Sequence, residues 1–258
     1  MNKTPGMTSF IGAGPGDPEL LTIKGAKAIA GAALIIYAGS LLPREILIGA
    51  RADAVIRDSA GMTLGETDAL IKSFARAGEP VARLHSGDPS LYGAAAEQIA
   101  LLEEENLPWE IIPGVTAACA AAAAAGIGFT KPEISQTLVI TRLAGRTPMP
   151  ADETPAALAA PHRSLAVYLA GAKAGELRAE LLKSLPPDTP VLCAHKVGQP
   201  GVKLVWTDID DMEKRVVENG LRDQTIFLIL PGHNKKGANS RLYDKKFGHR
   251  FREGSKGE

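Results

Sequence analysis

The feature that most constrains the fold of this chain is a repeated pattern: a short apolar run, a glycine-rich turn, then a longer amphipathic stretch. Ser9–Ile11 leads into one such turn, and Val81–Leu84 leads into another. Short apolar runs are typical of buried strands, and amphipathic stretches are typical of helices. Their alternation predicts an α/β fold, an open sheet with helices on its faces.

The pattern places strands and helices along nearly the whole chain. Strands are predicted at Ser9–Ile11, Ala33–Tyr37, Ala54–Arg57, Val81–Leu84, Trp109–Ile112, Gln136–Thr141, Leu165–Leu169, Val191–Ala194, Lys203–Trp206 and Thr225–Leu230. Helices are predicted at Thr22–Gly31, Pro43–Gly49, Glu66–Gly78, Leu91–Glu105, Thr116–Ala125, Ala172–Ser184 and Ile209–Asn219.

The composition changes in the middle of the chain, where glycines and a proline between 126 and 132 interrupt the pattern before it begins again. We therefore predict an N-terminal α/β domain over 1–128 and a C-terminal α/β domain over 129–240. A basic tail follows over 241–258. Two such domains predict an active-site cleft between them, since ligands often bind at domain boundaries.

Composition excludes several classes of protein. The chain has 258 residues, 45% hydrophobic and 22% charged, which suits a packed core. Its formal net charge of zero argues against a nucleic-acid partner. We see no signal peptide and no apolar run of the roughly 20 residues that a membrane span needs, so we expect a cytoplasmic protein without a membrane partner. Its two cysteines lack metal-ligand spacing, and we expect no protein-bound metal.

The first glycine turn reads GAGPGDP from Gly12 to Pro18. Glycines let a backbone turn sharply and approach a ligand or a neighbouring loop. A dinucleotide-binding turn would need glycine where this chain has Asp17, and Pro15 and Pro18 lack amide donors that a phosphate would use. The turn therefore suits a ligand other than a pyrophosphate, or is simply a tight connection.

The second turn reads HSGDPSLYG from His85 to Gly93, again between a predicted strand and a predicted helix. The carboxyl end of a strand is where open α/β sheets bind ligands. Asp88 either accepts hydrogen bonds at such a site or caps the following helix.

A third segment, Pro113–Thr116, precedes a run of alanines that only Cys119 interrupts. Alanine is the best helix former, but a helix without bulky side chains also lets a ligand approach its backbone. Thr116 would lie where the first amides of the helix are free. The segment fits both interpretations.

Two arginines follow the first predicted strand of the second domain. Arg142 comes directly after it, and Arg146 lies in the Pro-rich loop that continues the chain. Arginine suits bidentate binding of carboxylates. Surface salt bridges are the alternative role for both side chains.

Together these segments resemble the tetrapyrrole (corrin/porphyrin) methyltransferase family over essentially the whole chain. The motifs GAGPGDPELLT, HSGDPSLYG and PGVTA stand in the order found in that family. YAGSLL at Tyr37–Leu42, EISQT at Glu133–Thr137, GRTPMP at Gly145–Pro150 and the tail from Ser240 are similar to the branch that methylates C11 of precorrin-4.

The resemblance implies two α/β domains of the tetrapyrrole methylase type, not the Rossmann type of methyltransferase, and a homodimer. It implies S-adenosylmethionine as co-substrate, folded tightly and held largely by backbone groups. The implied reaction is methylation of precorrin-4 at C11, giving precorrin-5 and S-adenosylhomocysteine in cobalamin (vitamin B12) biosynthesis. Carried over residue by residue, the cofactor-binding positions are Pro15, Ser86, Gly87, Asp88, Leu91, Thr116, Ala117, Leu169, Val197 and Gly232.

The resemblance also implies a tetrapyrrole substrate with many carboxylates, for which Arg44, Arg142, Arg146 and part of the basic tail are the expected partners. Methyl transfer to an electron-rich carbon needs positioning rather than a covalent nucleophile, and the sequence shows no persuasive nucleophilic set. Where a base is needed, the candidates are Tyr92, Asp88, His85 and Glu133.

Three alternatives stay open at this point. In the first, the substrate is the cobalt-containing precorrin-4 of the anaerobic route, or another tetrapyrrole. The same residues would bind it. A dinucleotide-dependent oxidoreductase is the second alternative, and the missing glycine at position 17 argues against it. The third is a tetrapyrrole carrier, which would bind the ring but not S-adenosylhomocysteine.

Overall fold

The computed structural model describes residues 4–237, 240, 247–248 and 250–253. The chain divides into two compact units, one of Met1–Ala124 with Lys196–Lys203 and one of Ala125–His195 with Leu204–Glu258. The first unit thus ends a few residues before the predicted boundary at 128, and it includes a segment that the sequence places in the other domain. The predicted basic tail, 241–258, lies mostly outside the described residues.

The first unit contains a five-stranded sheet in the order β3-β2-β4-β1-β5, with every pair of neighbours parallel. Its strands are β1 Thr8–Gly12, β2 Leu34–Tyr37, β3 Val55–Asp58, β4 Val81–His85 and β5 Trp109–Ile112. Its helices are α1 Ile23–Gly31, α2 Leu64–Arg76, α3 Ala95–Glu103 and α4 Ala117–Ala124, with short 3-10 turns at Pro18–Leu20, Arg44–Leu47 and Ser59–Gly61.

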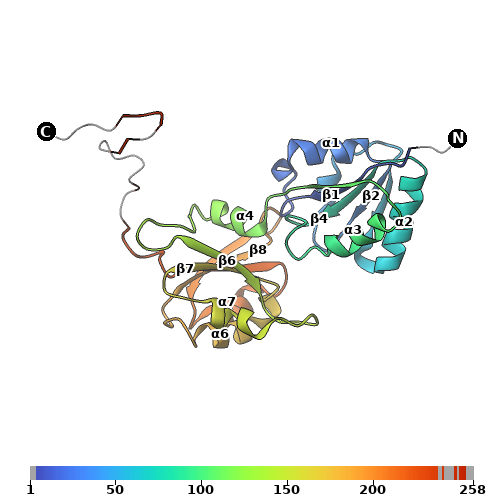
Figure 1. The fold of residues 1–258 in the computed structure, drawn as a ribbon. Helices are drawn as coiled ribbons and strands as arrows, with labels where there is room; N and C mark the ends of the chain where they lie inside the picture. The colour runs from blue at the N-terminus through green and yellow to red at the C-terminus, as the bar shows by residue number, and fades with distance from the viewer. Residues whose placement is uncertain (1–3, 238–239, 241–246, 249, 254–258) are drawn as a thin grey trace. The chain divides into compact units, whose positions relative to one another are not determined.

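Both faces of this sheet are covered, which explains why its central strands are almost continuously apolar. On one face Ile29 of α1 packs with Ile11 and Ile35. On the other, Ile71 of α2 and Leu102 of α3 pack with Phe10. Figure 1 shows α1 on one side of the strands and α2 and α3 on the other.

Helix starts in the first unit follow from capping side chains. Thr22 accepts a hydrogen bond from the Gly25 amide at 3.0 Å and so caps the start of α1. The prediction that a helix begins at Leu91 is wrong, because α3 begins only at Ala95. Tyr92 and Ala94 have φ angles of 56° and 50°, and this left-handed backbone keeps the chain out of the helix until after Ala94.

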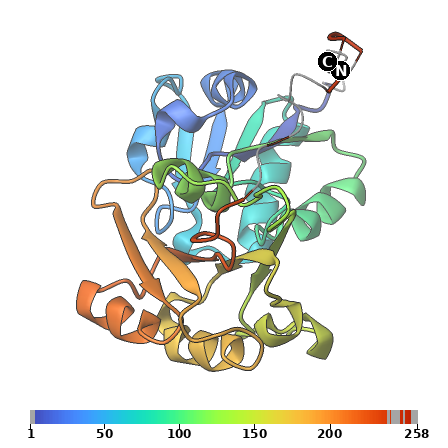
Figure 2. The ribbon, with the colours of Figure 1, turned by 90° about the vertical axis from the view of Figure 1, so that its left-hand side faces the viewer.

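The second unit contains a mixed sheet in the order β6-β7-β10-β8-β9. Its strands are β6 Thr137–Arg142, β7 Arg163–Tyr168, β8 Pro190–His195, β9 Lys203–Asp208 and β10 Thr225–Ile229. Its helices are α5 Pro155–Leu158, α6 Ala174–Leu181 and α7 Met212–Asn219, with 3-10 turns at Ala151–Glu153 and Gly171–Lys173. Figure 2 shows α5, α6 and α7 beside one another along one face of the sheet.

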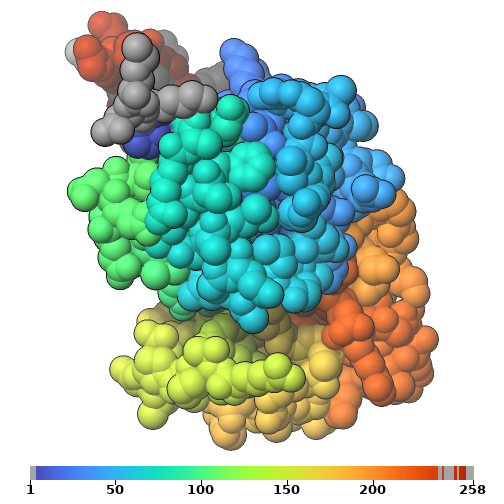
Figure 3. Space-filling view, turned by 90° about the vertical axis from the view of Figure 1, so that its right-hand side faces the viewer, coloured from blue at the N-terminus to red at the C-terminus, as the bar shows by residue number. Residues whose placement is uncertain are grey.

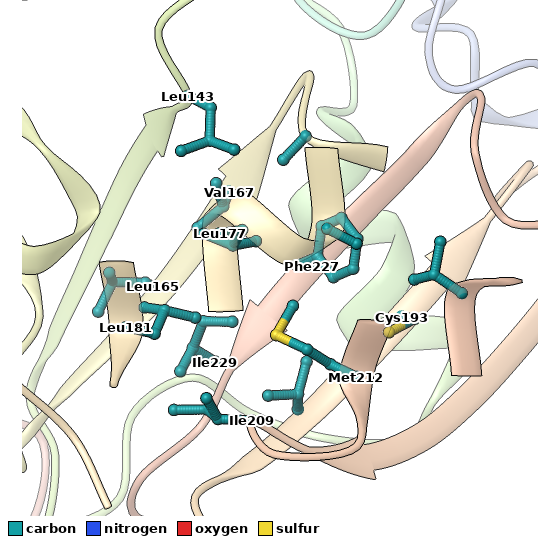
Figure 4. Close-up of a cluster of buried hydrophobic side chains, with 14 of the residues drawn as sticks. Leu143, Leu165, Val167, Leu177, Leu181, Cys193, Ile209, Met212, Phe227 and Ile229 are labelled. Carbon is teal, nitrogen blue, oxygen red and sulfur yellow. The ribbon is translucent and has the colours of Figure 1, made fainter. Parts of the chain in front are cut away.

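That covered face forms the core of the second unit. Phe227, at the centre of the cluster in Figure 4, is fully buried with Leu177 of α6 and Met212 of α7. Leu143, the first residue after β6, belongs to the same cluster, so the loop that follows it starts from an anchored position.

Strand directions define two ends of this sheet. β6 and β7 are parallel to each other, whereas β10 is antiparallel to both β7 and β8. The exits of β6, β7 and β8 and the entry of β10 therefore share one end, which we call the Leu169 end. The exit of β10 lies at the other, which we call the Gly232 end.

Within the part of the chain that the structure describes, no helix has both the length and the apolar character needed to cross a membrane.

Two adjacent valines of α7 test the core assignment. Val216 is 2% exposed and Val217 is 58% exposed. We expect Val216→Ala to lower the free energy of unfolding by about 2 kcal/mol, because it removes buried methyl groups and leaves a cavity. Val217→Ala should change it by less than about 0.5 kcal/mol. Urea denaturation of both variants measures the difference, and equal effects would contradict the packing of α7.

Candidate functional site

Three turns of the first unit meet at the carboxyl ends of β1, β4 and β5. The Gly14 amide donates to the Gly87 carbonyl at 3.2 Å, and the Gly87 amide donates back to the Gly14 carbonyl at 2.7 Å. The Ala13 amide donates to the His85 carbonyl at 2.8 Å. We call the three joined turns, residues 12–18, 85–93 and 113–117, the loop cradle.

The cradle can form only because its contact points lack side chains. A Cβ at Gly12 would lie 2.4 Å from the Gly114 nitrogen, and one at Gly114 would lie 2.2 Å from the Gly87 oxygen. Gly14 and Gly87 both have φ near 70°, which glycine adopts without strain. The glycines predicted to allow close approach therefore bring the loops against one another.

Asp88 joins two of these turns through its side chain. Its Oδ2 accepts a hydrogen bond from the Gly114 amide at 2.9 Å, and its Oδ1 accepts from the Ser90 amide at 2.9 Å and from the Ser90 hydroxyl at 2.5 Å. Capping of α3 by Asp88 was the alternative role, and the structure does not show it. Asp88 instead caps the local turn at Ser90 and holds the Gly114 turn in place.

The pKa of Asp88 reflects these contacts. Partial burial alone would raise the pKa, but the hydrogen bonds from Ser90 and Gly114 outweigh it and lower the pKa below 3.8. A lowered pKa means that the carboxylate contributes stability at pH 7, which is lost only as the pH falls below the ordinary value. It also makes Asp88 a weak proton acceptor.

His85, the last residue of β4, lies buried beneath the cradle. Burial first, and then the charge of Arg83, lower its pKa to about 4. The ring is therefore neutral at pH 7, and its low basicity argues against a role as general base.

The position of the cradle in the sheet favours ligand binding. β1 and β4 are neighbours, but the connection after β1 runs to β2 and the connection after β4 runs to β5, in opposite directions. Their helices α1 and α3 accordingly cover opposite faces. Such a switch point is where open α/β sheets bind ligands.

Gln199 supports the cradle from the segment Lys196–Lys203. Its Nε2 donates to the Pro15 carbonyl at 2.9 Å and to the Leu41 carbonyl at 3.0 Å. No local pattern points to this residue, because it lies far along the chain from the turn that it contacts.

The remaining first-unit predictions fall on or beside the cradle. Leu91 and Tyr92 follow Asp88, and Tyr92 is 47% exposed. Thr116 precedes α4 and its carbonyl accepts from the Ala120 amide, while Ala117 is the first residue of that helix. Arg44 is exposed in the 3-10 turn Arg44–Leu47, which contacts the 3-10 turn Pro18–Leu20.

In the second unit, unusual backbone geometry gathers at the Leu169 end. Leu169 after β7 and Gln224 before β10 have φ angles of 54° and 47°, rare for residues with side chains. Leu169 is also 69% exposed despite its apolar side chain. Strained backbone of this kind clusters at functional sites. Val197, two residues beyond β8, lies in the segment Lys196–Lys203 of the first unit.

Gly232 does not belong to that group. β10 starts at the Leu169 end, so Gly232 lies roughly 20 Å away along the strand direction, at about 3.3 Å per residue. Leu169 and Gly232 therefore lie at opposite ends of this sheet, and the assignment of both to the donor stays a prediction. Gly232 follows the exit of β10, whereas Gln224 and Thr225 mark its entry.

Gly232 instead lines a separate cavity of about 240 Å³ at its own end of the sheet. Lys131, Ser135 and Ser164 line the same cavity, and Glu133 lies in the connecting loop with a φ of 65°. Glu133 is thus not at the Leu169 end, where the strained turns gather.

Arg142, the last residue of β6, and Arg146, in the loop that follows, differ in their contacts. The guanidinium of Arg142 donates to main-chain carbonyl oxygens of its own loop, whereas Arg146 is exposed and makes no ion pair with any residue that the structure describes. The sequence analysis predicts the same role, carboxylate binding, for both arginines. Over the described ranges, no group of three His, Cys, Asp or Glu side chains is placed to hold a metal ion.

Comparison with known proteins agrees with this architecture. The model of the family Tetrapyrrole (Corrin/Porphyrin) Methylases matches residues 7–213. The chain belongs to this family, as its motifs predicted.

Two relatives indicate which branch of the family this chain is similar to. The chain is 42% identical to a precorrin-4 C(11)-methyltransferase of Pseudomonas aeruginosa, covering 95% of this chain and 98% of the relative. It is 39% identical to a cobalt-precorrin-4 C(11)-methyltransferase of Priestia megaterium, covering 96% and 98%. These relatives bear out the predicted similarity to the C11 branch.

Solved structures show the same fold. The X-ray structure of a cobalt precorrin-4 methyltransferase matches with a TM-score of 0.83 at 38% identity, covering 86% of this chain and 94% of that one. A uroporphyrin-III C-methyl transferase from Thermus thermophilus, complexed with S-adenyl homocysteine, matches with a TM-score of 0.72 at 25% identity, covering 87% and 97%. The predicted fold, two α/β units of the tetrapyrrole methylase type, is confirmed.

Two glycines of the first unit test the cradle. We expect Gly114→Ala to lower the melting temperature by several degrees, because its new methyl group would overlap the Gly87 carbonyl. Gly65→Ala is the control, since nothing lies within 4 Å of a Cβ there and alanine favours the helix. Calorimetry compares the two, and an unchanged melting temperature for Gly114→Ala would contradict the close approach of the loops.

Proposed function

We propose that this protein transfers the methyl group of S-adenosylmethionine to C11 of precorrin-4, giving precorrin-5 and S-adenosylhomocysteine in cobalamin biosynthesis. The observation that carries the proposal is the loop cradle, three glycine turns joined at the switch point of a parallel sheet, in a chain similar over nearly its whole length to C(11)-methyltransferases. Cobalt-precorrin-4 is the second candidate substrate, because relatives of both names match at 39% and 42% identity.

The cradle suits a donor that is bound mainly by backbone groups. Its turns meet without side chains between them, and Pro15 and Pro18 of the first turn lack amide donors. Oxygen atoms and a carboxylate nearby favour a positively charged sulfonium. In the first unit the binding residues would be Pro15, Ser86, Gly87, Asp88, Leu91, Thr116 and Ala117.

In the second unit, the strained backbone favours Leu169 and its neighbours at the same end of the sheet as donor-binding residues. We assign Leu169 and Val197 to the donor as predicted. Gln224 and Thr225 are added because they share the Leu169 end, while Gly232 stays a predicted donor residue at the other end of the sheet. Backbone held in rare conformations by a packed sheet is a rigid support for a ligand.

When bound, S-adenosylmethionine supplies an electrophilic methyl group. The chain's own residues orient the donor and the acceptor carbon, and good positioning lowers a barrier by up to about 7–11 kcal/mol. Asp88 contributes by holding the Gly114 turn in place, rather than by moving a proton, because its pKa is lowered. Tyr92 remains the candidate base, since it is exposed beside the cradle.

The proposal includes a homodimer in the cytoplasm. Ile23 and Ile48 are each 76% exposed on the first unit, an unusual exposure for isoleucine that contact with a second copy would explain. Two free cysteines suit a reducing compartment.

Asp88 provides the sharpest test of the donor site. We expect Asp88→Ala to weaken binding of S-adenosylhomocysteine by about tenfold to a hundredfold, because the Gly114 amide loses its acceptor and the third loop is released. Titration calorimetry measures the affinity. Glu97→Ala, a change at an exposed carboxylate of α3, should bind as tightly as the unaltered protein. Unchanged affinity in Asp88→Ala would count against the cradle as donor site.

Turnover tests the substrate. The protein incubated with S-adenosylmethionine should methylate precorrin-4, with S-adenosylhomocysteine formed in equal amount. Parallel reactions with metal-free and cobalt-loaded substrate, followed by mass spectrometry, decide between the two candidates. Binding of the ring without any methyl transfer would identify a carrier instead.

A further inference from the structure

We propose that residues 143–148, the β6 loop, form a preorganised carboxylate-binding element in which Arg146 contacts the substrate while Arg142 and Lys173 act as positioning residues. The inference rests on the proposed function for the identity of the ligand, a carboxylate-bearing tetrapyrrole. Its structural part, the bracing of the loop by two cations, stands on contacts within the second unit alone.

Four main-chain carbonyl groups of the loop are bound by two cationic side chains. Arg142 Nη1 donates to the carbonyl oxygens of Leu143 and Thr147, both at 3.1 Å, and its Nη2 donates to that of Pro148 at 2.9 Å. Lys173 Nζ donates to the Ala144 carbonyl at 3.1 Å. The planar guanidinium thus bridges both ends of the loop, which a single ammonium could not do.

This bracing changes which groups the loop presents. Carbonyl oxygens would repel a carboxylate, and here most of them are already bound to cations. A Cβ at Gly145 would meet nothing within 4 Å, so the tip is open. Arg146 is exposed at that tip and has no ion pair among the described residues, so its guanidinium is available for a bidentate carboxylate contact. In Figure 3 the yellow-green atoms of residues near 150 lie at the surface.

The loop also stands at a relevant place in its unit. Arg142 pairs with Tyr168 in the parallel ladder of β6 and β7, so the β6 loop leaves the sheet at the Leu169 end. That end also holds the strained turns assigned above to the donor. Leu143 fixes the start of the loop in the core. A carboxylate side chain of the substrate bound by Arg146 would therefore lie at the Leu169 end of the sheet rather than at the Gly232 end.

The positioning role is tested first without any substrate. Trypsin can cut after Arg146, and the bracing contacts should slow that cut. We expect Arg142→Met to speed cleavage at this bond by about tenfold, because three hydrogen bonds to the loop are lost, and Lys173→Met to speed it less. Lys183→Met is the matched control, since Lys183 also pairs with a glutamate three residues away but contacts no loop carbonyl. Equal cleavage in Arg142→Met and the control would overturn the bracing.

Ligand binding tests Arg146. With uroporphyrin III as a stable polycarboxylated probe, Arg146→Met should bind about tenfold more weakly by fluorescence titration, while the affinity for S-adenosylhomocysteine stays unchanged. If Arg142 acts through Arg146, the double variant should bind no more weakly than Arg146→Met alone. Additive losses would make Arg142 a direct contact, and an unchanged affinity in Arg146→Met would overturn the proposal.

Failure of the proposed function can be distinguished from failure of the β6-loop proposal. An unaltered protein that does not methylate precorrin-4 would contradict the assigned reaction, but it would leave the tryptic and uroporphyrin results standing. In the methylation assay, we expect Arg142→Met to raise the KM for the tetrapyrrole. The kcat and the KM for S-adenosylmethionine should stay unchanged. A fall in kcat alone would overturn the positioning role.

Discussion

The first unit depends on one constraint, the contact of three backbone turns at distances that exclude side chains. Gly12, Gly87 and Gly114 meet so closely that a Cβ at Gly12 or Gly114 would overlap a neighbouring main chain. Parallel strands bring their carboxyl ends to one edge of a sheet, and glycine lets the turns that follow them join there. The switch point of the sheet thus becomes a continuous surface of backbone, whose polar groups are arranged before any ligand arrives.

The charged side chains near this surface have mainly structural roles. Asp88 uses both oxygens to tie the second turn to itself and to the third. Arg142 in the other unit does the equivalent with opposite charge, binding carbonyl oxygens of its own loop. In both cases an ionised group satisfies main-chain polar atoms at a turn, which lowers the number of conformations the turn can adopt. A side chain of the type expected at an active site can therefore serve the site indirectly.

Sequence patterns predicted the strands well because their signal is local. The change from apolar run to glycine turn located all five strands of each sheet to within a few residues. The start of α3 was missed because tyrosine and alanine rarely adopt the left-handed backbone that Tyr92 and Ala94 have here. Gln199 was missed because its partners lie far away along the chain. Gly232 was grouped with Leu169 because a motif gives residue identity but not strand direction, and the direction of β10 separates the two.

Charge is distributed between the two units in a way that fits two ligands of opposite character. The cradle offers oxygen atoms and the Asp88 carboxylate, with a pKa low enough to keep it ionised at any physiological pH. A sulfonium is stabilised by such surroundings. The β6 loop instead has its carbonyl oxygens bound by Arg142 and Lys173 and leaves Arg146 exposed, an arrangement that favours carboxylates and disfavours a cation. Each element thus has its own electrostatic preference, one for the sulfonium of a methyl donor and the other for the carboxylates of a polyanionic acceptor.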